Sequence, residues 1–420
     1  MSGIAGQSWF SKPGLTRIFE LLNADGGEVR VVGGAVRNAL MGLPVGDIDL
    51  ATTLPPQDVV ERAKEAGIKA VPTGIEHGTV TLVLDGEGYE VTTLRRDVET
   101  DGRHAQVAFG TDWKEDAERR DLTINALYAD AAGEVIDLIG GLPDIETRTV
   151  RFIGDAARRI AEDRLRILRF FRFFAYYGSG RPDADGLRAS ARAKDTLSTL
   201  SAERVWSEMK KLLSAQDPSR ALLWMRQAGV LAQILPETEK WGIDAIHGLV
   251  AAERALGWTP DAMLRLASII PPDVERLAAI SARLRMSKNE AARLEQWAKT
   301  PAIDPAMAET ALDRLLYRQS PEALKMRLKL ALSSARADVS GGEASMQKIA
   351  RLSTLLARAE RFQKPVFPLS GADVLAAGVT PGPKVGEILG QLEEKWVEGN
   401  FAAEREVLLA RLREVASTGM

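Results

Sequence analysis

The chain of 420 residues contains no cysteine and only three histidines, which lie far apart in the sequence. Without cysteine there is no disulfide and no thiolate metal site. Three isolated histidines cannot build a histidine-rich zinc site or a phosphohydrolase domain of the His-Asp type. Any catalytic metal is therefore expected to be a hard cation held by carboxylates, for which Mg²⁺ is favoured.

Long hydrophobic runs are missing as well. No stretch approaches the roughly 18 apolar residues of a membrane span, and the first residues lack the basic start and apolar core of a secretory signal. These absences predict a cytoplasmic protein that does not associate with a membrane. The net charge of −3 does not exclude a nucleic-acid partner, because such a partner responds to a local patch and not to the sum.

The first 150 residues alternate strand-like and helix-like segments, which predicts an α+β domain with one small mixed sheet and flanking helices. A helix is expected over 55–67, where prolines precede and a glycine follows the pattern. A hairpin is expected around the turn signal at 85–88. The expected strands are residues 29–32, 48–51, 79–84, 89–94, 124–129 and 135–139.

Beyond Gly154 helical periodicity dominates to the end of the chain. Residues 155–177 are predicted to form one long helix that stops at the Gly-Ser-Gly run beginning at Gly178. Further helices are expected over 201–213, 219–235 and 351–361, and a terminal helix from Ala402. The overall expectation is an α/β head followed by about 265 helical residues.

The most informative segment reads VVGGAVRNALMGLPVGDIDL and begins at Val31. An apolar strand runs into Gly33 and Gly34, and a short helical stretch with Arg37 follows. A second strand then carries Asp47 and Asp49, which share a face about 6.5–7 Å apart because side chains alternate along a strand. Glycines that free backbone N–H groups, next to paired carboxylates, predict a metal-dependent site for a triphosphate.

Each of these features also has a simpler interpretation. A Gly-Gly pair is usually a turn, and Asp-x-Asp is often a solvated strand edge; their occurrence in order, with Arg37 between them, favours nucleotidyl transfer. Glu90 is the candidate for a third metal ligand because it could lie on an adjacent strand. An exposed glutamate at a strand end is an equally good interpretation of Glu90.

Two later runs supply candidate ligands for the nucleotide. Arg119, Arg120 and Asp121 precede the strand predicted over 124–129, and Asn125 lies near its start. Arginines suit triphosphate oxygens, and a carboxylate or amide can hold a ribose hydroxyl. Such a run also occurs on ordinary surfaces.

Within the predicted long helix, Asp163 and Arg166 are three residues apart and would share a helix face. A carboxylate beside a guanidinium matches the amine and ring nitrogen of cytosine and adenine, and it mismatches uracil and guanine. The simpler interpretation is a surface salt bridge.

In their order along the chain, several motifs together resemble the class II tRNA nucleotidyltransferases, the CCA-adding branch of the tRNA nucleotidyltransferase/poly(A) polymerase family in the polymerase-β-like superfamily. The matching segments are GGAVRNAL with DIDLAT, RRDLTINAL, DLIGGLPDI, RIAEDRLRILRFFRF and SAERVWSEMKKLL. The resemblance continues through LLWMRQAGVLAQILPE and PLSGADVLAAGVTPGPKVGEIL, so it spans nearly the whole chain.

The resemblance implies a catalytic head (1–150), a helical neck with the base-selecting site (151–215), a helical body (216–362) and a tRNA-binding tail (363–420). It implies two Mg²⁺ ions, the substrates CTP and ATP, and tRNA, gripped by its acceptor arm, as the partner. The implied residue roles are metal binding and catalysis by Asp47 and Asp49; triphosphate or ribose binding by Gly33, Gly34, Arg37, Arg120, Asp121 and Asn125; base selection by Asp163, Arg166 and Arg169; and a hinge or structural role for Asp137, Gly140, Gly141, Asp144, Glu203, Arg204 and Glu208.

The chain departs from the family pattern at two positions. Asn38 stands where members usually have Asp, which argues against a metal ligand there, and Leu122 stands where Phe is common, which should matter little. Poly(A) polymerases usually carry an Arg-Arg-Phe signature after the first motif, but here the stretch reads GIEHGTVTLVL. Enzymes that add only CC lack a flexible loop that residues 97–112, with Arg103, can provide. Full CCA addition is therefore favoured over a poly(A) polymerase, an A-adding specialist or a non-catalytic RNA-binding relic.

Overall fold

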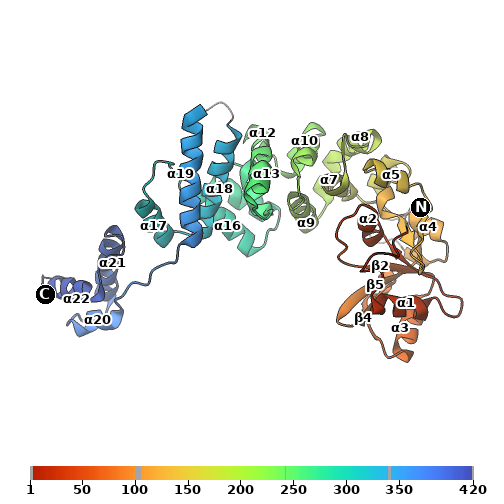
Figure 1. Ribbon diagram of the computed structural model, residues 1–420, viewed down its shortest axis with the longest axis horizontal. Coiled ribbons are helices and arrows are strands. Elements are labelled where there is room, and N and C mark those ends of the chain that lie inside the picture. Colours follow the sequence, from red (N-terminus) through yellow and green to blue (C-terminus); the bar gives the residue numbers. More distant parts are fainter. Residues whose placement is uncertain (1–2, 100–105, 242, 339–341, 419–420) are drawn as a thin grey trace. The chain divides into compact units, whose positions relative to one another are not determined.

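The computed structural model describes residues 3–99, 106–241, 243–338 and 342–418. By its contacts the chain divides into two compact units, Met1–Pro236 and Glu237–Met420. The first unit contains all the strands of the described residues, and the second consists of helices and their connections (Figure 1). The predicted α+β head followed by helices is thus confirmed, whereas the four-part division remains a prediction.

The first unit is built on a seven-stranded mixed sheet with the order β3-β4-β5-β2-β1-β8-β9. Only β2 and β5 run parallel to each other, with Asp49 beside Glu90. A separate ribbon pairs β6 with β7. The strands are β1 Val29–Val32, β2 Asp49–Thr52, β3 Lys69–Gly74, β4 Thr79–Leu84, β5 Glu87–Thr93, β6 Arg95–Glu99, β7 Gln106–Phe109, β8 Leu127–Ala129 and β9 Val135–Asp137.

The predicted hairpin is confirmed between β4 and β5. Asp85 and Gly86 both have positive φ (51° and 81°), as the tight turns that match strand twist require. Along β4, Val80, Leu82 and Leu84 are buried and alternate with partly exposed residues. This period of two places the apolar side chains in the core of the sheet.

Short helices cover the sheet. They are α1 Pro13–Leu22, α2 Gly34–Leu40, α3 Pro56–Glu65, α4 Trp113–Glu118 and α5 Leu142–Thr147. Both α1 and α3 have proline in the first turn, where its missing N–H costs nothing. The predicted helix over 55–67 corresponds to α3.

The helical part of the first unit follows. Its helices are α6 Ala156–Glu162, α7 Arg166–Tyr177, α8 Ala184–Ala193, α9 Ala202–Leu213, α10 Ser219–Gln227 and α11 Val230–Ile234. Helix α7 packs on α9 and α10. Its Phe170 stacks on Phe152, with ring centroids 5.3 Å apart, so the apolar face of α7 forms the core of this region.

Two hydrophobic clusters of the described residues lie in the second unit. One lies among α17, α18 and α19, around Leu316, Leu328 and Leu355, and the other surrounds Trp396 of α21. The helices are α12 Thr238–Trp241, α13 Ala245–Leu256, α14 Ala262–Ile269, α15 Val274–Arg283, α16 Lys288–Lys299, α17 Glu309–Arg318, α18 Pro321–Ala337, α19 Gly342–Arg361, α20 Gly371–Ala376, α21 Pro383–Glu398 and α22 Arg405–Thr418. Among the described residues no helix is both long and apolar enough to cross a bilayer.

Several predicted elements differ in the structure. The single helix expected over 155–177 is two helices, because the chain is extended at Asp163 (φ −144°). The Asp163 side chain accepts a hydrogen bond from the Leu165 N–H (3.0 Å), a local bond that competes with helix continuation. The strand expected over 124–129 begins with a 3₁₀ turn, Thr123–Asn125, before β8. The helix expected over 219–235 is interrupted at Gly229, which has φ 71°.

The segment expected to be a loop over 97–112 contributes instead to β6 and β7 at its two ends. Residues 100–105, with Arg103, lie outside the described residues. Strand β3 was not predicted, because Lys69–Gly74 shows neither alternation nor a run of β-branched residues.

Candidate active site

A cavity of about 600 Å³ in the first unit gathers most of the candidate residues. It opens between the ends of β1, β2 and β5, the segment that precedes β8, and the first turns of α7 and α9. The candidate residues that line it are Gly33, Gly34, Arg37, Asp49, Glu90, Arg120, Asp121, Asn125, Asp163, Arg166, Arg169 and Arg204. Arg95, Arg119 and Phe173 line it as well.

The acids lie where β2 begins. Asp49 is the first residue of β2 and pairs in register with Glu90 of β5, while Asp47 precedes the strand. Asp47 and Asp49 are exposed and the intervening Ile48 is buried. Asp47 nevertheless lies before β2, not on the strand as predicted, and it is not among the residues that line the cavity. Desolvation in the cavity wall, and then the charges of Glu90 and Asp47, raise the pKa of Asp49. A cation at this point would relieve the repulsion.

The two glycines form the turn between β1 and α2. Gly33 has φ 68°, a conformation that residues with a Cβ rarely adopt. Its N–H donates to the Leu127 carbonyl of β8 (3.0 Å). The turn thus holds the start of α2, and with it Arg37, against the cavity.

A buried network fixes Arg120. The Asp116 carboxylate accepts from Arg120 Nε (3.1 Å) and Nη2 (3.0 Å) and from the Tyr128 hydroxyl (2.8 Å). Burial alone would raise the pKa of Asp116, but Arg120 and Arg119 outweigh it, and the pKa lies below its ordinary value. Asp116 therefore stays ionised and orients Arg120 toward the cavity.

A second chain of bonds runs from Asp121 to α7. Arg169 donates from Nε to the Asp121 carboxylate (2.7 Å), and Asn125 donates to the other oxygen of the same group (3.1 Å). Asp121 and Asn125 are buried. Desolvation raises the pKa of Asp121, but Arg169 lowers it and holds it below its usual range. The carboxylate therefore remains an acceptor.

Asp163 and Arg166 line the same cavity but form no ion pair with each other. Asp163 precedes α7, and its second oxygen accepts from Arg204 of α9 (3.0 Å). Arg166 is bound by Glu162 (2.6 Å) and by the Arg159 carbonyl (3.0 Å). The expectation that the pair shares one helix face is wrong, because the chain turns between them.

Of the residues expected in a hinge or structural role, Arg204 lines the cavity, whereas Asp137, Gly140, Gly141 and Asp144 do not. The Asp137 carboxylate accepts from the N–H groups of Ile139, Gly140, Gly141 and Leu142 (2.9–3.2 Å). Asp144 is buried and accepts from Thr123 and from Arg151 Nε (2.6 Å). These bonds tie the turn after β9 to the cavity wall. A hinge motion stays a prediction.

The two glutamates of α9 also lie outside the lining. Glu208 is buried and pairs with Arg172 of α7 (2.6 Å), which fixes the contact between α7 and α9. Glu203 is exposed in the first turn of α9.

Three contributing residues were missed in the sequence. Asp116 and Tyr128 position Arg120, and Tyr177 contacts Arg37 (2.7 Å). The spacing of Asp116 and Arg120, four residues on one helical turn, could have indicated their pairing. Nothing in the sequence pattern indicates that Tyr177, 140 residues away, meets Arg37.

The donor set at Asp47, Asp49 and Glu90 consists of hard carboxylate oxygens, as Mg²⁺ prefers. Within the described residues, no group of three or more His, Cys, Asp or Glu side chains is arranged to hold a metal ion. The expected three-residue ligand set is therefore not assembled by the protein alone. Mg²⁺ commonly takes one or two carboxylates and completes its shell with substrate phosphates and water, so the residues fit such an ion.

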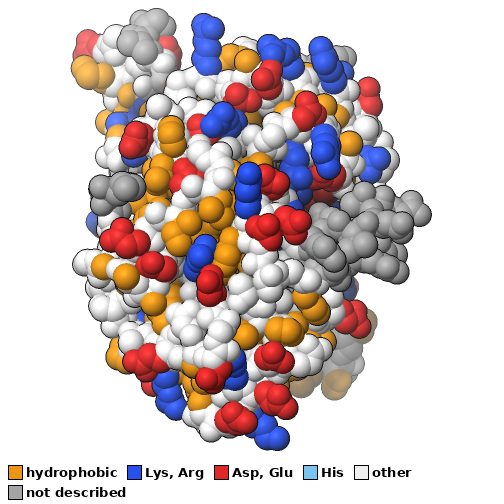
Figure 2. Space-filling model, turned by 90° about the vertical axis from the view of Figure 1, so that its right-hand side faces the viewer, with side chains coloured by type: hydrophobic (Ala, Val, Ile, Leu, Met, Phe, Trp, Pro, Cys, Tyr) orange, Lys and Arg blue, Asp and Glu red, His pale blue; other side chains and the backbone are white. Residues whose placement is uncertain are grey.

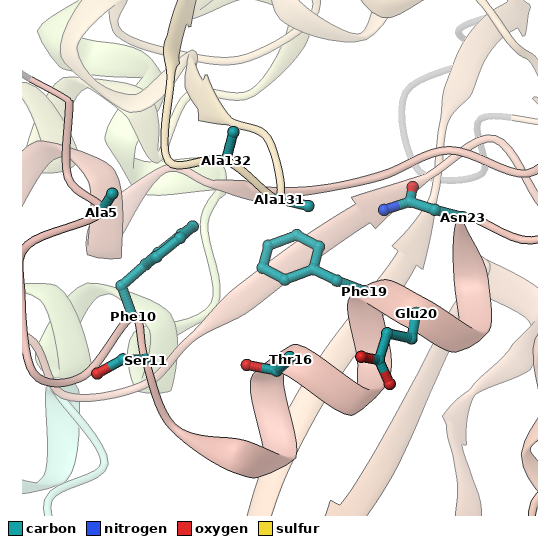
Figure 3. Close-up of a pocket in the computed structure, with 9 residues that line it drawn as sticks. All are labelled: Ala5, Phe10, Ser11, Thr16, Phe19, Glu20, Asn23, Ala131 and Ala132. Atoms are coloured by element: carbon teal, nitrogen blue, oxygen red, sulfur yellow. The ribbon is translucent and has the colours of Figure 1, made fainter.

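A second cavity, of about 500 Å³, lies between α1 and the turn that joins β8 to β9. Figure 3 shows Phe10 and Phe19 facing this space beside Ala131 and Ala132. Glu20 is the only charged residue of the lining, so this cavity has no group suited to a polyphosphate. On the face shown in Figure 2, positive and negative side chains are interspersed. The charges suited to a nucleotide are concentrated inside the larger cavity.

The chain has clear relatives. Residues 29–151 match the poly A polymerase head domain family, and residues 183–241 match the family described as the probable RNA and SrmB-binding site of polymerase A. The chain is 34% identical over 417 residues to the mitochondrial CCA tRNA nucleotidyltransferase 1 of Mus musculus, covering 97% of this chain and 91% of the relative. It is 30% identical to the CCA-adding enzyme of Limosilactobacillus fermentum, covering 96% of each.

The fold is also similar to that of a CCA-adding enzyme. The crystal structure of the Bacillus stearothermophilus CCA-adding enzyme in complex with CTP superposes with a TM-score of 0.69 and 28% identity. That match covers 97% of this chain and 99% of the other.

Proposed function

Because the chain belongs to the family of CCA-adding tRNA nucleotidyltransferases and is itself a nucleotidyltransferase, we propose that it adds C, C and A to the 3′ end of tRNA. The substrates are CTP and ATP, pyrophosphate is released, and no nucleic-acid template is used. The observation that carries the proposal is one cavity whose lining combines Asp49 and Glu90, several arginines, and the Asp163 and Arg166 side chains.

The lining of the cavity offers groups for each part of a nucleotide. Arg37 and Arg120 would bind phosphate oxygens, as guanidinium groups do through their N–H donors. Asp121 and Asn125 are placed for the ribose, since each is held by its neighbours and keeps acceptor capacity. Positioning of this kind accounts for much of the rate of a phosphoryl transfer.

Asp47 and Asp49 would hold two Mg²⁺ ions together with phosphate oxygens, and Glu90 is the candidate third ligand. When bound, Mg²⁺ neutralises the triphosphate and lowers the pKa of the terminal ribose hydroxyl of the tRNA. The protein's own contribution is to keep the carboxylates of Asp49 and Glu90 on paired strands in the interior of the sheet.

Base selection would rest on Asp163 and Arg166, with Arg169 nearby. A carboxylate accepts up to about four hydrogen bonds, so Asp163 can take an exocyclic amine while Arg204 and Leu165 remain bound. A uracil or guanine at this position would leave buried groups unpaired, at a cost of about 1–3 kcal/mol per group.

The partner is tRNA, since the mouse relative is named a tRNA nucleotidyltransferase. The helical residues beyond the cavity are the candidates for gripping its acceptor arm. That relative is also named mitochondrial, so a cytoplasmic location for this chain rests on its sequence alone.

The test is nucleotide incorporation by the purified protein. With tRNA that lacks CCA, CTP, ATP and Mg²⁺, sequencing of the 3′ end should show CCA. Asp49→Asn should lower the rate by at least about a hundredfold, as the loss of a charge-stabilising group does, while Asp85→Asn in the β4–β5 turn should not.

Other outcomes would identify the other candidates. Long tails from ATP alone on a generic RNA primer would indicate a poly(A) polymerase, whereas at most one added A would indicate an enzyme of the CCA-adding type. Tight tRNA binding by a folded protein without turnover would indicate an RNA-binding relic and would overturn the proposal.

A further inference from the structure

Arg37 differs from its neighbours in the charge of its partners. Five of the other arginines that line the cavity form ion pairs with acids: Arg119 and Arg120 with Asp116, Arg166 with Glu162, Arg169 with Asp121, and Arg204 with Asp163. Within the part of the chain that the structure describes, Arg37 forms no ion pair.

All acceptors of the Arg37 guanidinium are neutral. Asn38 Oδ1 accepts from Nε (3.1 Å) and Nη2 (2.9 Å), Asn125 Oδ1 accepts from Nη1, and the Tyr177 hydroxyl accepts from Nη2 (2.7 Å). The Tyr177 ring also lies 4.0 Å from the guanidinium carbon. Four hydrogen bonds thus hold the group without neutralising it.

A buried guanidinium whose acceptors are all neutral has an unfavourable free energy unless an anion binds beside it. Arg37 is only 6% exposed, and a buried charge without a counter-charge loses hydration that neutral acceptors restore only in part. Burial lowers the pKa of Arg37, but a guanidinium remains protonated at neutral pH. Asp121, the acid whose charge raises the pKa of Arg37, is already engaged by Arg169 and Asn125.

We propose that Asn38 and Tyr177 are positioning residues that hold the Arg37 guanidinium without neutralising it, so that its charge is reserved for the triphosphate of the incoming nucleotide. The proposal deepens the proposed function and rests on it for the identity of that anion. Asn38 leaves the positive charge of Arg37 uncompensated, because it offers the same acceptor geometry as an aspartate but no negative charge.

Tyr177 connects two regions of the first unit. It is the last residue of α7, whose first residue is Arg166 at the base-selecting side of the cavity. The bond from Arg37 to Tyr177 therefore attaches the triphosphate end of the cavity to the same helix. The position of α7 and the orientation of Arg37 are coupled by this bond.

The test is a calorimetric titration of the full-length protein with inorganic tripolyphosphate in the absence of metal. Asn38→Asp keeps the shape and adds a counter-charge. It should weaken tripolyphosphate binding by about tenfold or more, because an ion pair at Arg37 competes with the anion. Asn289→Asp, an exposed position in α16, adds the same charge elsewhere and should leave the dissociation constant unchanged.

Kinetics then separate a positioning role from a general loss of structure. Asn38→Asp should raise KM for CTP and for ATP alike, with little change in kcat and none in the rejection of UTP. Equal or tighter tripolyphosphate binding by this variant would overturn the proposal. Because the titration needs no turnover, its result stands even if the nucleotides added prove to be others than proposed.

Tyr177→Phe is the second variant. It removes the acceptor but keeps the ring over the guanidinium, so tripolyphosphate affinity should fall by about two- to fivefold, the effect of one lost hydrogen bond. Its thermal unfolding temperature should stay close to that of the unaltered protein. An unchanged dissociation constant for Tyr177→Phe would overturn the role given to Tyr177.

Discussion

At the scale of single residues, the cavity depends on side chains that never touch a substrate. Asp116 is the clearest case: it is 2% exposed and holds Arg119, Arg120 and Tyr128 together. Removing one partner of a buried ion pair leaves the other charge without compensation. The stability of the first unit and the position of Arg120 are therefore linked.

Asp116→Ala should lower the free energy of unfolding by about 3–5 kcal/mol. Glu118→Ala provides a matched control, because Glu118 is an exposed acid of the same helix whose pair with Lys114 is long (3.8 Å); its loss should cost less than about 1 kcal/mol. Denaturant titration of both variants measures the difference. Equal effects would show that the Asp116 network does not stabilise the fold.

The same residue makes a prediction about pH. The pKa of Asp116 in the folded protein lies below its ordinary value. The contribution of Asp116 to stability is therefore fully present above the pKa of the unfolded chain, about 4, and it is lost as the pH falls through the pKa of the folded protein. Stability should therefore decline on acidification below about pH 4. The decline should be shallower for Asp116→Ala. Parallel curves for the two proteins would contradict this role.

Prediction from the sequence worked where strands could be recognised. Glu90 was proposed as a residue that could lie on a strand beside Asp49, with an exposed strand end as an equally good interpretation, and the register of β2 and β5 pairs the two residues. Tyr177 could not be found in this way, because its contact with Arg37 arises from the packing of α7 against the sheet domain. Long-range contacts of this kind leave no periodic signal in the chain.

At the scale of elements, the break between α6 and α7 has the largest consequence for the site. A continuous helix would have put Asp163 and Arg166 on one face as a salt bridge. The extended backbone at Asp163 instead separates them, and each side chain lines the cavity with a different partner. Helical periodicity over 155–177 concealed this break, because the pattern of apolar residues continues through it.

The break leads to a prediction about base choice. Asp163→Ala should reduce the preference for CTP over UTP by about tenfold or more, since the mismatch penalty of 1–3 kcal/mol per group is lost. The control is Asp155→Ala at the N-terminus of α6, where the side chain caps Arg158 N–H (2.7 Å); that variant should lose about 1 kcal/mol of stability and keep its preference. Unchanged rejection of UTP by Asp163→Ala would count against the base-selecting role.

At the scale of the whole molecule, the described residues form two units with separate cores. The second unit contains a buried ion pair, Glu253 with Arg265, whose side chains are 3% and 0% exposed. Neither residue has a place in the cavity of the first unit. The sequence predicted helices here but not this pair, because charged residues twelve positions apart carry no pairing signal.

Glu253→Gln should lower the free energy of unfolding of the second unit by about 3–5 kcal/mol. Calorimetry should show one transition shifted to lower temperature while nucleotide binding at room temperature stays the same. Glu295→Gln, in an exposed pair with Lys299 on α16, should change the transition little. A single transition that shifts as a whole would mean that the units unfold together.

The most direct measurement is a structure of the protein with CTP and magnesium. The account predicts the triphosphate beside Gly33, Arg37 and Asp49, and the cytosine beside Asp163 and Arg166, in the cavity that these residues line. A nucleotide bound in the smaller cavity next to Phe19 (Figure 3), or one whose phosphates lie away from Arg37 and Asp49, would contradict it.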